Sequence, residues 1–202
     1  MQTAGLEPQG GRITDSEIVE RVRSGDSQAY AELVKSHYPR VRGLCFSLLS
    51  NPSESEDAAQ EIFIKAYRFL PQFKSNSSFS TWIYRIASNH CMDALRKEAR
   101  HKTESLDALT DASESGDAPP RLRVSEPDSS AAFENKDIVR RVLERLSPEH
   151  RVVLVLKETQ GLSYAEIART LECSVDAVKG RLKRARVELD GIARHFMELS
   201  GV

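Results

Sequence analysis

The sequence has few of the features that mark secreted, membrane-bound or disulfide-rich proteins. Its longest apolar run is Val152–Leu156, whereas a membrane span needs ~20 residues. The N-terminus has no basic start and no apolar stretch of the kind that forms a secretory signal. Cys45, Cys91 and Cys173 lie far apart, which argues against both a zinc ribbon and a disulfide framework. We therefore expect a cytoplasmic chain that does not insert into membranes.

Catalytic signatures are equally scarce among the 202 residues. There is no nucleophile constellation, no Cys/His cluster with metal-ligand spacing and no glycine-rich phosphate loop. The sequence therefore predicts a protein that is not an enzyme and that uses no cofactor and no metal. A formal net charge of -1 would also argue against a nucleic-acid partner if the charges were evenly spread.

The charges are instead concentrated in two segments of opposite sign. Residues 103–134 hold eight acids and two bases, which gives -6 there and leaves +5 on the rest of a chain whose total is -1. Because this segment is also rich in Ser, Pro and Gly, residues 103–133 are predicted to form a flexible acidic linker. By contrast, residues 179–186 hold five bases and no acid. The neutral total therefore does not exclude nucleic-acid binding.

Capping motifs and apolar spacing predict helices on both sides of this linker. The expected helices start at Thr14 and run over about 26–49, 53–70 and 80–100, and Pro39 is expected to kink or break the second. The β-branched run Val152–Leu156 is assigned to a helix because Ser147, Pro148 and Glu149 open it. The predicted fold is all-α, with a disordered tail (1–12) and two small helical domains (13–102 and 134–202).

The C-terminal domain contains the pattern of a helix-turn-helix. Ser163-x-x-Glu166 is a capping box that opens a short helix, and Glu172-Cys173-Ser174 interrupts it. Ser174 then caps a second helix, and two short helices joined by about three residues describe this motif. A small core of Leu162, Ile167, Val175, Val178 and Leu182 is expected.

The second helix presents a basic outer face suited to DNA. The N-terminal part of a recognition helix reads the edges of the DNA bases, and Lys and Arg side chains further along the helix hold phosphates. The candidate DNA-binding residues are Ser174, Lys179, Gly180, Arg181, Lys183 and Arg184. The alternative is a solvated basic helix, since Lys and Arg also favour helix C-termini. We favour DNA binding because the segment combines a capping box, a turn, the apolar spacing of a small core and a basic face.

Seven of the 13 aromatic residues fall between Phe63 and Tyr84, on both sides of the polar loop 74–78. Aromatic rings beside basic side chains can hold single-stranded nucleic acid. The alternative is that most of these rings are core. We expect core positions for Phe63, Tyr67 and Phe69, whose spacing suits helix packing. Phe73 and Phe79 flank the loop and are the preferred functional candidates, whereas Trp82 suits either role.

An acidic patch marks the start of the third expected helix, with four acids in the eight residues 54–61. Acids at a helix N-terminus complement the helix dipole. Asp57, Gln60 and Glu61 also share one helix face at i, i+3 and i+4, which allows a partner contact.

Three blocks in this order resemble bacterial sigma factors of the extracytoplasmic-function (group four) class. They are the segment from Asp57 to Tyr67, the segment from Phe79 to Asn89, and the helix-turn-helix. The resemblance covers about residues 14–102 and 134–195. It implies a protein that joins core RNA polymerase, directs it to promoter DNA and helps to open the duplex. An anti-sigma factor is a common partner in this class.

The resemblance also implies roles for particular residues. Asp57, Gln60 and Glu61 match the surface that docks on the coiled coil of the polymerase clamp. The residues that match the melted minus-ten element's binding surface are Phe73, Asn76, Phe79, Trp82, Arg85 and Asn89. Those that match the recognition helix for the minus-thirty-five element are Lys179, Gly180, Lys183 and Arg184.

The length of the linker agrees with these roles. Two promoter elements two helical turns apart need roughly 70 Å, and a linker of roughly 28 residues can stretch to about 95 Å. The alternative function is a conventional helix-turn-helix regulator whose N-terminal half senses a ligand or dimerises. Such a regulator binds duplex DNA tightly without polymerase, whereas a sigma factor confers promoter-specific transcription only with core enzyme.

Overall fold

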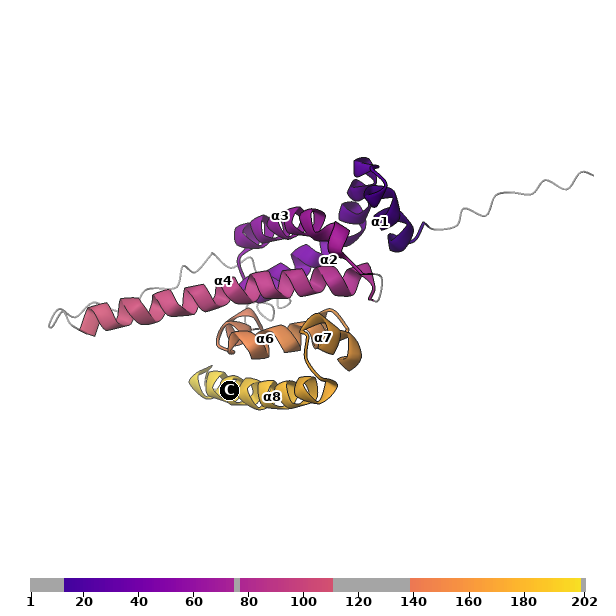
Figure 1. Ribbon diagram of the computed structural model, residues 1–202. Helices are drawn as coiled ribbons and strands as arrows, with labels where there is room; N and C mark the ends of the chain where they lie inside the picture. Colours follow the sequence, from indigo (N-terminus) through magenta and orange to yellow (C-terminus); the bar gives the residue numbers. More distant parts are fainter. Residues whose placement is uncertain (1–12, 75–76, 111–138, 201–202) are drawn as a thin grey trace, which may run out of the picture.

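The computed structural model describes residues 13–74, 77–110 and 139–200, and the regular structure within these ranges is all helical (Figure 1). The N-terminal helices are α1 (Asp15–Arg23), α2 (Tyr30–Leu49), α3 (Pro52–Phe69) and α4 (Phe79–Thr110), with single 3-10 turns at Ser27–Ala29 and Leu70–Gln72. The C-terminal helices are residues 139–144, α6 (Pro148–Leu154), a π-helical continuation at Val155–Thr159, α7 (Tyr164–Thr170) and α8 (Val175–Ser200). The all-α prediction is confirmed.

The predicted helix starts are confirmed at α1 and displaced at α3. At α1 the backbone N–H of Thr14 donates to Glu17 at 2.7 Å, and Thr14 accepts from the Glu17 N–H at 3.3 Å. This is the expected capping box. At α3 the cap is Asn51, whose side chain accepts from the N–H of Ser53 and Glu54. The capping motif expected to open this helix at Ser53 is therefore wrong, because the helix already begins at Pro52, a residue that suits the first helical position.

Pro39 lies inside α2, and the helix continues through it from Tyr30 to Leu49. A proline lacks the N–H that would bond to the carbonyl four residues earlier, which is destabilising in a helix interior. Leu33, Val41 and Leu44 are completely buried on the same helix. Their burial on both sides of Pro39 offsets the lost bond, so the expected break is wrong.

The helix α4 is longer than predicted, at 32 residues. Residues 103–110, assigned to the linker by their charge and composition, are helical because Ala, Leu and Glu are good helix formers. The rest of the predicted linker (111–133) and the predicted tail (1–12) lie outside the described residues, as do residues 134–138 of the C-terminal domain.

The two helical domains pack directly on each other. Figure 1 shows α6 and α7 (orange) beside α4 (magenta), with α8 (yellow) on their far side. The apolar core runs without interruption from Leu48 and Ile83 in the N-terminal domain to Val152 and Leu156 in the C-terminal domain. No local pattern predicted this docking, which determines how the candidate surfaces lie relative to one another.

Candidate nucleic-acid and partner interfaces

The helix-turn-helix is formed by α7, a short turn and α8. Ser163 opens α7 with the predicted capping box, in which its N–H and hydroxyl donate to Glu166 at 2.8 and 2.6 Å. These two hydrogen bonds lower the pKa of the Glu166 carboxyl below its usual value. Ser174 accepts from the N–H of Ala177 at 3.1 Å and caps α8, also as predicted. Both helices of the motif thus start at the positions that the sequence indicates.

The turn between the helices has the geometry of a Schellman motif. The N–H of Cys173 donates to the carbonyl of Ala168 at 3.0 Å, across Glu172 in the left-handed region at φ +51°. Glycine is the usual residue at such a position, and a side chain there costs about 1–2 kcal/mol. The chain therefore holds a strained glutamate at the entrance to the second helix.

The core of the motif is as predicted except at one position. Leu162, Ile167, Val178 and Leu182 are buried. Val175, expected in this core, is 38% exposed, because as the first residue of α8 it lies beside the turn rather than under α7. Ala185, one helical turn beyond Leu182, is completely buried and completes the buried stripe of α8.

The outer face of α8 carries the basic residues predicted to bind DNA. Lys179, Lys183 and Arg184 are exposed, and Gly180 and Arg181 are partly exposed. Lys179 pairs with Asp176 at 3.1 Å, and Arg181 donates to the sulfur of Cys173 at 3.6 Å. Within the described residues, Lys183 and Arg184 form no ion pair. Two uncompensated positive charges therefore point to solvent from one helix face.

The acidic patch lies on the outer face of α3. Asp57, Gln60 and Glu61 are all exposed, as the i, i+3, i+4 spacing predicted. Ile64 continues this face at i+7 and is 53% exposed. Sequence reasoning missed Ile64, although the same periodicity that grouped the three polar residues also includes it. An exposed apolar side chain among acids suits a protein partner better than free solvent.

Glu61, at one end of this acidic patch, belongs to a small cluster of ionisable groups. Glu61 lies 3.8 Å from Lys65 and 3.9 Å from His90, and the nitrogens of Lys65 and His90 are 2.8 Å apart. Burial and the neighbouring ammonium of Lys65 lower the pKa of His90. Glu61 itself remains exposed for contact.

The aromatic residues are distributed in the opposite way to the prediction. Tyr67 and Phe69, expected in the core, are 44% and 49% exposed, and only Phe63 of that group is buried. Phe73 and Phe79, expected to be available for base stacking, are both in the core. The burial of Phe73 and Phe79 argues against direct base stacking by these rings, and their preference as functional candidates stays a prediction.

The buried rings form one cluster at the N-terminal end of α4. Phe73, Phe79 and Trp82 lie with ring centroids 5.1 to 6.0 Å apart. Arg23 of α1 donates to the carbonyl of Phe73, and to that of Leu70 at 3.3 Å. These contacts anchor the residues on both sides of the predicted base-capturing loop, whose residue Asn76 lies outside the described residues.

Two further candidates for melted DNA lie on α4. Asn89 is exposed, and Arg85 is partly exposed. The Arg85 guanidinium donates to Glu172 of the helix-turn-helix at 2.6 Å. The structure thus brings a candidate for the melted element and the strained turn of the other domain together.

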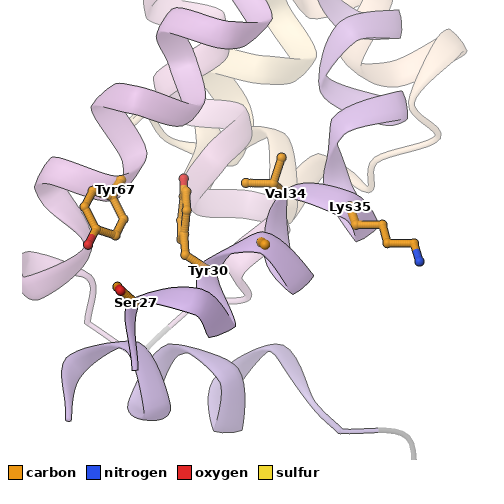
Figure 2. A pocket seen from close by; sticks show the side chains of 6 residues that line it. Ser27, Tyr30, Val34, Lys35 and Tyr67 are labelled. Atoms are coloured by element: carbon orange, nitrogen blue, oxygen red, sulfur yellow. The ribbon is translucent and has the colours of Figure 1, made fainter. Parts of the chain in front are cut away.

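A shallow apolar depression lies between α2 and α3 (Figure 2). It is lined by Ser27, Tyr30, Ala31, Val34, Lys35 and Tyr67. The rings of Tyr30 and Tyr67 face each other with centroids 4.9 Å apart, and the Tyr30 hydroxyl donates to the carbonyl of Phe63 at 2.7 Å. The exposure of Tyr67 is therefore one-sided, because its ring rests on Tyr30.

Two absences bear on the candidate chemistry. In the described part of the chain no group of three or more His, Cys, Asp or Glu residues is placed to hold a metal ion. None of the helices described is both long and apolar enough to cross a membrane.

Comparison with known proteins gives the class of the chain. Residues 33–101 match the family model of sigma-70 region 2, and residues 136–189 match that of sigma-70 region 4. The chain is 37% identical over 182 residues to the ECF RNA polymerase sigma-E factor of Escherichia coli (strain K12), covering 89% of this chain and 94% of that protein. It is 35% identical over 178 residues to the RNA polymerase sigma-H factor of Pseudomonas aeruginosa, covering 87% and 92%.

Solved structures of similar proteins agree with this class. The structure of CnrH in complex with the cytosolic domain of CnrY matches with a TM-score of 0.63 and 25% identity, over 88% of this chain and 96% of that one. The sigma factor RpoE in complex with the anti-sigma factor NepR from Bartonella quintana shares the fold, with a TM-score of 0.57 and 22% identity over 82% and 96%. The chain belongs to the extracytoplasmic-function sigma factors of the sigma-70 family, which direct RNA polymerase to promoters and start promoter-specific transcription.

Proposed function

We propose that this chain uses three separate surfaces for initiation, as a cytoplasmic factor without catalytic activity, cofactor or metal. The face of α3 with Asp57, Gln60, Glu61 and Ile64 docks on core RNA polymerase. The outer face of α8 reads the minus-thirty-five element. Arg85 and Asn89 of α4, beside the loop that contains Asn76, contact the melted minus-ten element. The uncompensated charges of Lys183 and Arg184 carry this proposal, because exposed bases without acid partners are available for phosphates.

The burial of Phe73, Phe79 and Trp82 changes the role proposed for these rings. Instead of stacking on a base directly, they form a buried floor that holds the start of α4 in place. Arg23 contributes by holding the Phe73 carbonyl. A fixed floor favours base capture because the residues that begin α4 are already ordered when DNA binds.

The experiment that tests the proposed function is run-off transcription with core polymerase on a promoter template, with and without the full chain. Promoter-specific transcripts that need both components support it. The alternative, a conventional regulator, is supported instead if the chain binds duplex DNA tightly alone and gives no promoter-specific transcript with core enzyme.

An anti-sigma factor is a further proposed partner. Two of the matching solved structures are complexes, one with the cytosolic domain of CnrY and one with the anti-sigma factor NepR. Copurification of the tagged chain from its own host, followed by inhibition of run-off transcription with the captured protein, tests this proposal. A captured protein that leaves transcription unchanged contradicts it.

A further inference from the structure

An acidic residue lies within the basic outer face of α8. At about 100° per residue, the residues that share one side of this helix are Asp176, Lys179, Gly180 and Lys183. Asp176 is the second residue of the helix, and its side chain is 91% exposed. The N-terminal part of a recognition helix is the part that reaches base edges. Asp176 therefore lies where the base sequence is read, although its charge has the same sign as that of the DNA phosphates.

The helix itself does not depend on the Asp176 carboxylate. Ser174 caps the first turn of α8, because its hydroxyl accepts from the N–H of Ala177 at 3.1 Å. Asp176 pairs with Lys179, and both side chains of this pair are exposed. An exposed i, i+3 ion pair contributes little to stability, so breaking it costs little free energy. Both charged groups are therefore available to a ligand.

Gly180 leaves a gap in the same face, one helical turn beyond Asp176. A glycine inside a helix is destabilising relative to alanine. A Cβ built on Gly180 would meet only an ordinary contact, since the nearest described atom is Nη1 of Arg184 at 3.6 Å. Packing among the described residues thus gives no reason for glycine at this position. Glycine also occurs where a backbone approaches a ligand closely, and here it would let the helix lie deeper in the groove.

The spacing of Asp176 and Lys179 matches the edge of a C·G base pair. Oδ1 of Asp176 and Nζ of Lys179 lie 3.1 Å apart. In the major groove cytosine presents its N4 amino donor, and guanine presents the O6 and N7 acceptors. N4 and O6 are hydrogen-bonded to each other, at about 2.9 Å. A carboxylate and an ammonium at a similar separation therefore meet the donor and the acceptor of one base pair at the same time.

The other base pairs fit this arrangement less well. Adenine also presents an amino donor, but thymine presents one acceptor, O4, beside a methyl group. Guanine presents two acceptors to the ammonium, which favours C·G over A·T. Reversing the pair to G·C exchanges donor and acceptor, so that the carboxylate faces an acceptor. The arrangement is therefore selective for both the identity and the orientation of the pair.

We propose that Asp176 is a specificity-determining residue of the recognition helix, which accepts a hydrogen bond from the N4 amino group of a cytosine while Lys179 donates to the paired guanine. Gly180 provides the close approach that this contact needs. The inference rests on the proposed function, because it assigns the chemistry of the α8 face that reads the minus-thirty-five element. It adds a base pair that the element must contain.

Selection of upstream elements from a randomised duplex library tests this readout, with holoenzyme reconstituted from core polymerase and the full chain. The wild type is expected to select C·G at one position of the element. Asp176→Ala is expected to lose about ten-fold of the preference at that position and to keep the preferences elsewhere. Asp176→Asn is expected to change the selected base from cytosine to adenine, because an Asn side chain pairs with N6 and N7 of adenine.

Asp190→Ala is the matched control for the lost charge. Asp190 is an exposed acid of the same helix, about 21 Å beyond Asp176 and outside the part that reads base edges. We expect this variant to select the same bases as the wild type. If Asp176 served only to complement the helix dipole, Asp176→Ala and Asp176→Asn would also keep the wild-type preference at every position, and that result overturns the proposal.

Gly180→Ala tests the close approach separately. It is expected to raise the urea midpoint of the full chain, because alanine is the better helix former. It is also expected to weaken holoenzyme binding to the selected element by about ten-fold, the loss of a base contact. Gly191→Ala is the control, at an exposed position of the same helix where a Cβ would meet no described atom within 4 Å. Wild-type DNA binding by Gly180→Ala contradicts the close approach.

These measurements distinguish the readout from the proposed function. If the holoenzyme gives promoter-specific transcripts and selects the same bases with wild type and Asp176→Asn, the readout by Asp176 is overturned and the function stands. If the chain gives no such transcript but selects duplex DNA by itself, the proposed function is overturned. In that selection a change from cytosine to adenine with Asp176→Asn supports the readout, and unchanged bases overturn it.

Discussion

The ring of Phe79 packs against that of Trp82 with centroids 5.6 Å apart and an angle of 48° between the planes. Phe79 is the first residue of α4 and follows directly on the loop that the resemblance assigns to base capture. It is also completely buried. The beginning of this helix is therefore fixed by core packing.

The first prediction concerns this packing. Phe79→Ala is expected to lower the free energy of unfolding by about 3–5 kcal/mol, because it removes a fully buried aromatic ring and leaves a cavity. Urea denaturation of the full chain measures the change. Phe69→Ala, at a 49% exposed position of the same domain, is expected to cost about 1 kcal/mol or less. Equal losses in the two variants would show that Phe79 is not a core residue.

The second prediction concerns the basic face of α8. Lys183→Ala with Arg184→Ala is expected to weaken holoenzyme binding to the upstream element and to reduce the dependence of log K on log salt by about 2, one for each lost phosphate contact. Titrating the salt concentration in a DNA-binding assay measures this slope. Lys35→Ala with Arg42→Ala removes the same charge from exposed positions of α2 and serves as the control. A wild-type slope in the α8 variant would contradict the assignment.

The third prediction concerns the acidic face of α3. Asp57→Ala with Glu61→Ala is expected to reduce association with core polymerase at least about ten-fold, while exposed helix charges contribute little to stability. Copurification with core enzyme and urea denaturation measure the two effects. Glu20→Ala with Asp93→Ala removes two exposed acids from α1 and α4. Loss of polymerase binding in both double variants would point to net charge rather than to this face.

Substitution of Ile64 tests the docking face of α3 separately from its acids. Ile64→Ala is expected to weaken polymerase association without loss of stability, because 53% of this side chain is exposed in the free protein. Copurification with core enzyme measures the association, and Val187→Ala, at a 66% exposed position of α8, is the control. Wild-type association of Ile64→Ala would limit the docking surface to its polar residues.

The fourth prediction uses the lowered pKa of Glu166. Because its folded pKa lies below the unfolded value, its hydrogen bonds to Ser163 stabilise the helix-turn-helix above that unfolded value and are lost as the pH falls through the folded pKa. Ser163→Ala is therefore expected to cost about 1 kcal/mol at neutral pH. The difference from the wild type should shrink on acidification.

Urea denaturation at neutral pH and at about pH 3 checks this sign. Ser163→Thr keeps the hydroxyl and is expected to retain the pH dependence of the wild type. A difference between Ser163→Ala and the wild type that is independent of pH would mean that the cap acts without the Glu166 carboxylate.

Local signals predicted the parts of the structure that depend on neighbouring residues. The capping boxes at Thr14 and Ser163 and the cap at Ser174 form because each bonds within three positions of itself. The exposed face of Asp57, Gln60 and Glu61 followed from helical periodicity alone. Such features need no knowledge of the rest of the fold.

The aromatic assignments failed because exposure depends on distant residues. Tyr67 and Phe73 have similar chemistry and lie on either side of the same helix end, yet Phe73 is covered by Trp82 and Phe79 while Tyr67 rests on the surface of Tyr30. The docking of Arg151 on α2 spans 103 positions and leaves no periodic trace in the sequence. Its detection required the three-dimensional arrangement.

Because α4 is long, a small tilt at one end of the helix displaces the other end much further. Its 32 residues extend over about 48 Å, and Figure 1 shows its far end projecting beyond the neighbouring helices. A tilt of about 5° at the Phe79 end, where the loop proposed for base capture ends, would displace the Thr110 end by about 4 Å. Strand capture at one end of the rod would thus be transmitted as a movement of the point from which the chain continues to its second domain.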